Sequence, residues 1–107
     1  MFWPEEAYLR QYELIVILDP ELGEEEVPDA IERLIRSPVE DRGGEVSEVA
    51  NWGHRKLAYP IQKKSEGNYV LTQLRLDPQQ TKELEQRLMI SEQVMRHLLI
   101  RLEEEKA

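Results

Sequence analysis

The residue types best suited to binding chemistry are concentrated between Trp52 and Lys63, where aromatic side chains alternate with cations. Aromatic rings such as Tyr59 stack on unpaired bases, and cations such as Arg55 and Lys56 contact phosphates, so the mixture is typical of RNA recognition. A solvated charged hairpin would contain the same residue types. Composition alone therefore leaves both interpretations open.

The charge distribution favours a local binding site over a generally basic surface. The net charge of -8 by itself argues against a nucleic-acid partner, because nonspecific affinity depends on neutralising phosphates. Residues 1–50 carry a net charge of -10, whereas residues 51–65 contain Arg55, Lys56, Lys63, Lys64 and no acid. An acidic body with one basic segment predicts weak phosphate binding by the chain alone.

The residue types of an active site do not assemble in this sequence. The two histidines, His54 and His97, are far apart, and the absence of cysteine removes disulfides and thiolate chemistry. The carboxylate runs 24–26 and 103–105 are typical of a helix start and a solvated tail. Residues 19–22 read Asp-Pro-Glu-Leu, where a phosphatase of this size would need a glycine-rich anion loop. We expect no enzymatic activity, metal or cofactor.

The elements that must position the basic segment are four strands and two helices. Alternating or β-branched patterns predict strands over residues 10–19, 45–61, 67–76 and 93–102, with a bulge at Gly53 and a turn over residues 62–66. Helical spacing predicts one helix that begins near Pro28 or earlier, at residues 24–26, and a second that begins at Pro78 behind an Asp77 cap.

Helical phase predicts Leu34 and Leu88 as core residues, and Pro38 predicts a kink or an end of the first helix near Ser37. The pair Gly43 and Gly44 would close that segment.

This order of elements predicts an α+β ferredoxin-like βαββαβ sandwich, a four-stranded antiparallel sheet with two helices on one face. The other sheet face would have no cover within the chain, so Ile15, Ile17 and Leu71, with Glu13, form a predicted protein interface, while Tyr12 faces the helices. Ordinary surface residues would explain the same pattern.

We expect one domain over residues 9–102, with a flexible extension at residues 1–8 and an acidic tail at residues 103–107. No apolar run is long enough for a membrane span, and Glu5 and Glu6 stand where a signal peptide would be basic, so we expect a soluble, intracellular protein.

The basic segment also resembles the hallmark of a known family. Gly53, the Arg55–Lys56 pair and residues 57–61, Leu-Ala-Tyr-Pro-Ile, match in register the S-six family of bacterial small-subunit ribosomal proteins. The resemblance covers nearly the whole chain, and its further matches are Tyr12, Glu13, Pro20, Gly67, Tyr69, Ile90, Glu92, Val94, Arg96 and Leu98. The chain departs from the family pattern by its N-terminal extension, by Pro38 within a helix and by ending just beyond the last strand.

The resemblance implies a structural constituent of the 30S subunit in the cytoplasm, which pairs with ribosomal protein S-eighteen and binds the central domain of 16S ribosomal RNA as that heterodimer. The residues predicted to contact RNA are Arg10, Arg55, Lys56, Tyr59, Lys63, Lys64 and Arg96, although Tyr59 would equally suit packing within the hairpin. The main alternative is a regulatory ferredoxin-like module that binds a small metabolite and forms a homodimer through its sheet. A small hydrolase is a third hypothesis.

Overall fold

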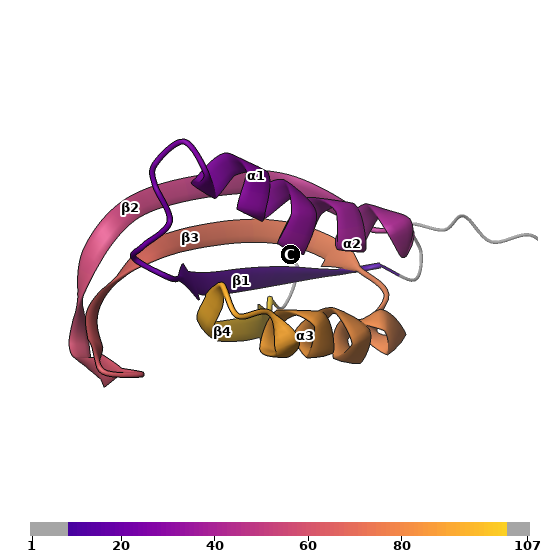
Figure 1. Ribbon diagram of the computed structural model, residues 1–107. Helices are drawn as coiled ribbons and strands as arrows, with labels where there is room; N and C mark the ends of the chain where they lie inside the picture. Colours follow the sequence, from indigo (N-terminus) through magenta and orange to yellow (C-terminus); the bar gives the residue numbers. More distant parts are fainter. Residues whose placement is uncertain (1–8, 103–107) are drawn as a thin grey trace, which may run out of the picture.

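The computed structural model describes residues 9–102, which form one antiparallel sheet covered on one face by helices (Figure 1). The strands lie in the order β2-β3-β1-β4, which confirms the predicted ferredoxin-like α+β fold. Their bounds are β1 Arg10–Leu18, β2 Glu45–Ile61, β3 Lys64–Leu76 and β4 Val94–Arg101. The helical segments are α1 Val27–Ile31, a π-helical turn Glu32–Arg36, α2 Ser37–Asp41, a 3-10 turn Pro78–Gln80 and α3 Thr81–Ile90.

The predicted extension 1–8 and tail 103–107 lie outside the described residues. Within residues 9–102, no helix combines the length and the apolar character needed to cross a membrane.

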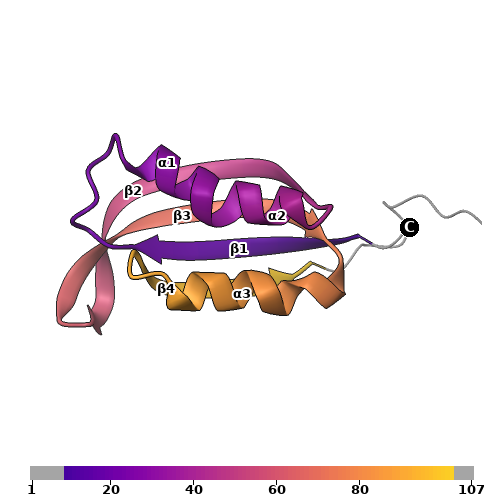
Figure 2. The same ribbon diagram turned by 45° about the vertical axis from the view of Figure 1, so that its right-hand side comes forward.

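The hydrophobic core lies between the sheet and the two helical segments, which run side by side over it in both views (Figure 2). Alternate residues of β1 face it, as predicted, because successive side chains of a strand point to opposite faces. These residues are Tyr12, Leu14, Val16 and Leu18. Leu84 and Leu88 of α3 are fully buried against them, so the predicted core position of Leu88 is confirmed.

The first helical segment is continuous from Val27 to Asp41, so of the two outcomes predicted near Ser37, a kink or an end, the end does not occur, and the helix instead has an irregular π-helical turn at Glu32–Arg36. Proline cannot donate a backbone hydrogen bond and clashes with the carbonyl four residues earlier. The helix meets this constraint by widening one turn before Pro38, where the Ser37 N–H donates to the Glu32 carbonyl, five residues back.

The wider π turn also changes the phase of the helix. Ile35 is buried, whereas Leu34 is only half-buried at the edge of the core, so the predicted core position of Leu34 is wrong. The start is also later than the acidic residues 24–26 suggested: they form a turn, and Pro28 is the second residue of the helix.

The predicted glycine stop of this helix is confirmed. Gly43 has φ +81°, its N–H donates to the Glu40 carbonyl at 3.0 Å, and the Gly44 N–H donates to the Val39 carbonyl at 2.9 Å. This pair of hydrogen bonds is a Schellman motif, which requires a residue that accepts positive φ. A Cβ atom on Gly44 would lie 2.3 Å from the Arg75 carbonyl oxygen, so glycine is also required for the close approach to β3.

The β2–β3 hairpin is tighter than predicted. Its turn is only Gln62 and Lys63, with φ 52° and 66°, and β3 begins at Lys64 instead of Gly67. Two successive residues with positive φ indicate a type I′ turn, whose twist matches that of paired strands. The bulge predicted at Gly53 is present: the pairing register shifts there, and φ is +74°.

The second helical segment begins as predicted. The Asp77 carboxylate accepts from the Gln79 N–H at 2.9 Å, and the first turn after it is a 3-10 turn that contains Pro78. The helix α3 then continues to Ile90, and the last strand begins at Val94, one residue later than predicted.

The open sheet face has a partial cover of its own. The far ends of β2 and β3 curl beyond the rest of the sheet (Figures 1 and 2), and Leu57 from this end packs with Ile17 and Met95 in a second, smaller cluster. The prediction of a face without any cover is therefore wrong at its hairpin end. Ile17 is only 9% exposed, because a long hairpin can bend back over the sheet that it extends.

Candidate RNA and protein interface

The uncovered part of the open sheet face is apolar. We call Ile15, Leu71, Leu98 and Ile100 the sheet-face patch. In the sheet register Ile15 lies between Leu71 of β3 and Leu98 of β4, and Leu98 is 54% exposed. Glu13 lies beside Ile100 at one edge. The structure thus places Glu13, Ile15 and Leu71 together as predicted and adds Leu98 and Ile100, which the alternation of the last strand could have identified.

Arg96 and Tyr59, both predicted as RNA contacts, lie against each other at the border of this patch. Arg96 of β4 donates a hydrogen bond to the Tyr59 hydroxyl of β2, and its guanidinium carbon lies 5.9 Å from the centre of the Tyr59 ring. The ring remains 55% exposed. The guanidinium therefore orients an aromatic ring that is still accessible for stacking.

A second aromatic and cation pair lies farther back along β2. The Arg55 guanidinium carbon is 6.0 Å from the Trp52 ring, and Arg55 Nε donates to the Trp52 carbonyl at 3.2 Å. The bulge at Gly53 separates the two residues, and the Gly53 N–H donates to the Asn51 side chain at 2.9 Å. The bulge and its local hydrogen bonds thus keep Trp52, which is half-exposed, beside Arg55.

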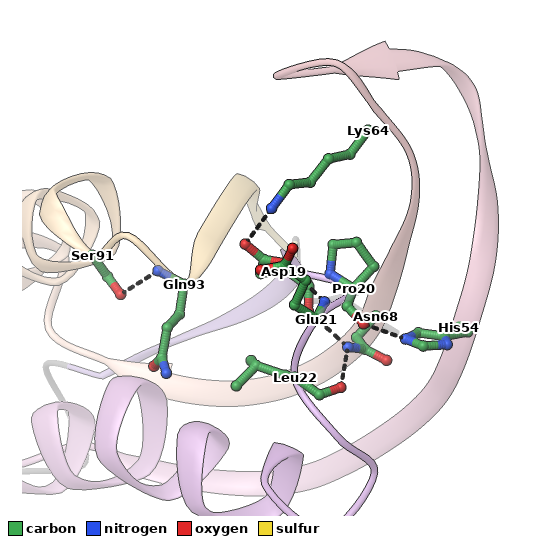
Figure 3. Close-up of polar contacts among 9 residues, drawn as sticks. All are labelled: Asp19, Pro20, Glu21, Leu22, His54, Lys64, Asn68, Ser91 and Gln93. Atoms are coloured by element: carbon green, nitrogen blue, oxygen red, sulfur yellow. Dashed lines mark hydrogen bonds and ion pairs between the residues drawn. The ribbon is translucent and has the colours of Figure 1, made fainter.

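Lys64, another predicted RNA contact, is bound within the chain. Its ammonium lies 2.6 Å from Asp19 Oδ2, in the loop that follows β1 (Figure 3). The Asn68 amide donates to the Asp19 carbonyl at 3.0 Å, and His54 Nε2 lies 3.0 Å from the Pro20 carbonyl. Side chains from both strands of the hairpin thus fix it to this loop. Lys64 therefore has a partner within the fold in addition to its predicted role at RNA.

The ion pair predicts a specific pH dependence. The hydrogen bond from Lys64 lowers the pKa of Asp19, with a further contribution from the Glu21 N–H, and the bond to Asp19 raises the pKa of Lys64. A carboxyl group whose pKa is lowered by folding stabilises the folded state at pH values above its unfolded-state pKa, and this stability is lost as pH falls through its folded-state pKa. An ammonium group whose pKa is raised by folding contributes stability that is lost at high pH. Lys64→Ala should therefore destabilise the protein at neutral pH, and the difference should shrink as pH falls below the ordinary pKa of aspartate and vanish once Asp19 is protonated in the folded state.

Urea melts of both proteins at several pH values would measure this difference. The neighbouring Lys63 is exposed in the turn and has no ion-pair partner among residues 9–102, so Lys63→Ala is the matched control. A difference between wild type and Lys64→Ala that is the same at neutral and acid pH would contradict the assignment of the Asp19 ion pair.

The remaining predicted RNA contacts lie in two places. Lys56 and Lys63 are exposed on the hairpin beside the residues described above. Arg10 lies at the other end of the sheet, where it pairs with Leu76, whereas the hairpin turn precedes Lys64 at the opposite end of β3. The structure therefore does not bring Arg10 to the hairpin.

Both histidines have partners that account for them structurally. His97 Nε2 lies 3.1 Å from Glu85 of α3, and His54 contacts the loop after β1. In the part of the chain that the structure describes, no three histidine, aspartate or glutamate side chains gather into a metal-binding group.

Comparison with known proteins gives consistent matches over nearly the whole chain. The family model of ribosomal protein S6 matches residues 11–101. The small ribosomal subunit protein bS6 of Caldanaerobacter subterraneus is 46% identical over 96 residues, which cover 90% of this chain and all of that protein. The bS6 protein of Leifsonia xyli is 45% identical, over 90% of this chain and 74% of its own length. The crystal structure of 30S ribosomal protein S6 from Thermotoga maritima has a TM-score of 0.81 and 34% identity, over 88% of both chains.

Proposed function

Because this chain belongs to the ribosomal protein S6 family, we propose that it binds the central domain of 16S ribosomal RNA as a heterodimer with ribosomal protein S-eighteen. The family membership confirms the resemblance seen in the sequence, the place in the small ribosomal subunit and the non-enzymatic class. The observation that supports RNA binding together with S-eighteen is the proximity of two unlike surfaces, the apolar sheet-face patch and the cationic, aromatic hairpin.

The sheet-face patch suits a protein partner. Leu98 and Ile100 are large apolar side chains on the exposed side of β4, and contiguous exposed apolar residues are typical of interfaces. Glu13 at its edge and the net charge of -8 favour a basic partner, because complementary charge speeds association and fixes orientation. We infer that S-eighteen covers Glu13, Ile15, Leu71, Leu98 and Ile100.

The hairpin suits RNA. Arg55, Lys56 and Lys63 supply the charges for phosphate oxygens, and the ring of Tyr59, held by Arg96, supplies a stacking surface. Lys64 can contribute to RNA binding only with the part of its charge that the ion pair with Asp19 does not neutralise. Arg10 would contact a separate part of the RNA, because it lies at the other end of the sheet. Three to four cations on an acidic chain give weak binding by themselves, so the partner must supply further phosphate contacts.

Gel-shift titrations with central-domain RNA would test the proposal, using this protein alone, S-eighteen alone and the two together. We expect negligible binding by this protein alone and tight, salt-dependent binding by the pair. Leu98→Glu should abolish the cooperative binding, because it introduces a charge into the patch, whereas Lys82→Glu on the exposed side of α3 should not. Tight binding by this chain alone would contradict the cooperative proposal. A stable homodimer that does not exchange for S-eighteen would instead support the regulatory module.

A further inference from the structure

A shallow groove lies on the helical side of the molecule, away from the sheet-face patch. It has a volume of about 640 Å³ and is lined by Arg42, Glu83, Gln86, Arg87, Met89 and Ile90. Met89 and Ile90 are 71% and 81% exposed, which is unusual for two consecutive large apolar residues. They lie on the outer face of α3, so the sheet cannot cover them.

The charges of the groove favour an acidic occupant. Arg42 is paired with Glu83 at 3.0 Å, which leaves the charge of Arg87 without an ion-pair partner among residues 9–102. An occupant that matches this surface combines an apolar side chain with a nearby carboxylate. The chain itself contains such a segment at its N-terminus, where Phe2, Trp3 and Pro4 precede Glu5 and Glu6.

We propose that residues 1–8 dock in this groove, with Phe2 or Trp3 on Met89 and Ile90 and with Glu5 or Glu6 beside Arg87. The proposal concerns a segment that precedes the family match and does not depend on RNA binding.

The length of the segment fits the distance. Arg10 pairs with Leu76 and, with Asp77 and Pro78, lines a hollow at the start of the second helical segment. From Pro78 to Ile90 the helical segment rises by about 20 Å. The seven residue steps from Phe2 to Leu9 span about 23 Å when extended. The aromatic residues can therefore reach the end of α3, and Glu5 and Glu6 then come within side-chain reach of Arg87 in its last turn.

Disulfide trapping in the full-length chain would test this docking, because the native sequence contains no cysteine. We expect the double variant Phe2→Cys, Ile90→Cys to form an intramolecular disulfide at least about tenfold faster than Phe2→Cys, Glu40→Cys. Glu40 is an exposed residue of α2 outside the groove. It lies near the end of the sheet where β1 begins, because α2 is followed by Glu45 of β2, and Glu45 and Gln11 both pair with Arg75. Random collisions would thus trap the Glu40 pair at least as fast as the Ile90 pair. Equal rates, or disulfide-linked dimers in place of monomers, would overturn the proposal, and dimers would identify a second copy as the occupant.

A second measurement reports on the segment without cysteines. In a Trp52→Phe background Trp3 is the only tryptophan, so its quenching by acrylamide measures its exposure. We expect Ile90→Ser to increase the quenching constant at least about twofold, because it removes an apolar contact from an exposed position that the fold does not need. Quenching that does not change with Ile90→Ser would overturn the docking.

Discussion

Leu88→Ala and Ile35→Ala are each expected to lower the free energy of unfolding by about 2 to 5 kcal/mol. Both side chains are almost completely buried between the helices and the sheet, where truncation removes apolar contacts and leaves a cavity. Urea melts that follow the far-ultraviolet circular dichroism would give the change in free energy from the shift in midpoint at constant slope.

Two controls separate burial from a general effect of alanine. Lys82 and Leu88 belong to the same helix, but Lys82 is exposed. Lys82→Ala should therefore alter the free energy of unfolding by less than about 0.5 kcal/mol. Leu34→Ala should cost less than Ile35→Ala, because the π turn places Leu34 at the edge of the core. A larger loss for Leu34→Ala would mean that the helix keeps the regular α-helical phase through Pro38.

The sequence was most informative where one local pattern decides the structure. The alternation of β1 assigned Tyr12 and Leu14 to the core and Glu13 and Ile15 to the other face, because the period of a strand is two. The glycine pair after α2 and the Asp77 cap were equally readable, since each satisfies backbone groups of its own helix end.

The first helix shows where local patterns are insufficient. Pro38 forbids a regular α-helical turn but does not decide between ending the helix and widening it. Burial of Ile35 and Val39 against the sheet favours the continuous helix, and that energy depends on residues far away in the sequence. The phase of Leu34 could not be predicted for the same reason.

The candidate site divides in the same way. The residue types of the hairpin pointed to RNA, but the partners of its side chains depend on how the hairpin curls over β1 and β4. This curl brings Tyr59 to Arg96 and Lys64 to Asp19, and both pairs join residues more than thirty positions apart. Local spacing carries no information on such contacts.

The internal ion pair of Lys64 also decides which residues can test RNA binding cleanly. Changing Lys64 would remove one of the contacts that hold the hairpin to the loop after β1, so a loss of RNA affinity would combine an effect on the fold with the loss of an RNA contact. Lys56 and Lys63 are exposed and have no ion-pair partner in the described part of the chain, so their truncation should leave the melting curve nearly unchanged.

Lys56→Ala combined with Lys63→Ala is expected to weaken binding of the S-eighteen heterodimer to central-domain RNA by about 30-fold, at about 1 kcal/mol for each phosphate contact. The magnitude of the slope of log affinity against log salt should fall by about 1 to 2, because binding releases about one counterion fewer for each phosphate contact that is lost. Titrations at several salt concentrations would measure both quantities.

The matched control is Lys82→Ala with Arg87→Ala, which removes the same charge from exposed positions of α3, on the helical side of the sheet, and should leave the slope unchanged. If the hairpin variant kept the wild-type slope, these lysines would touch no phosphate, and the RNA contacts would have to lie at Arg55, at the Tyr59–Arg96 pair or at Arg10.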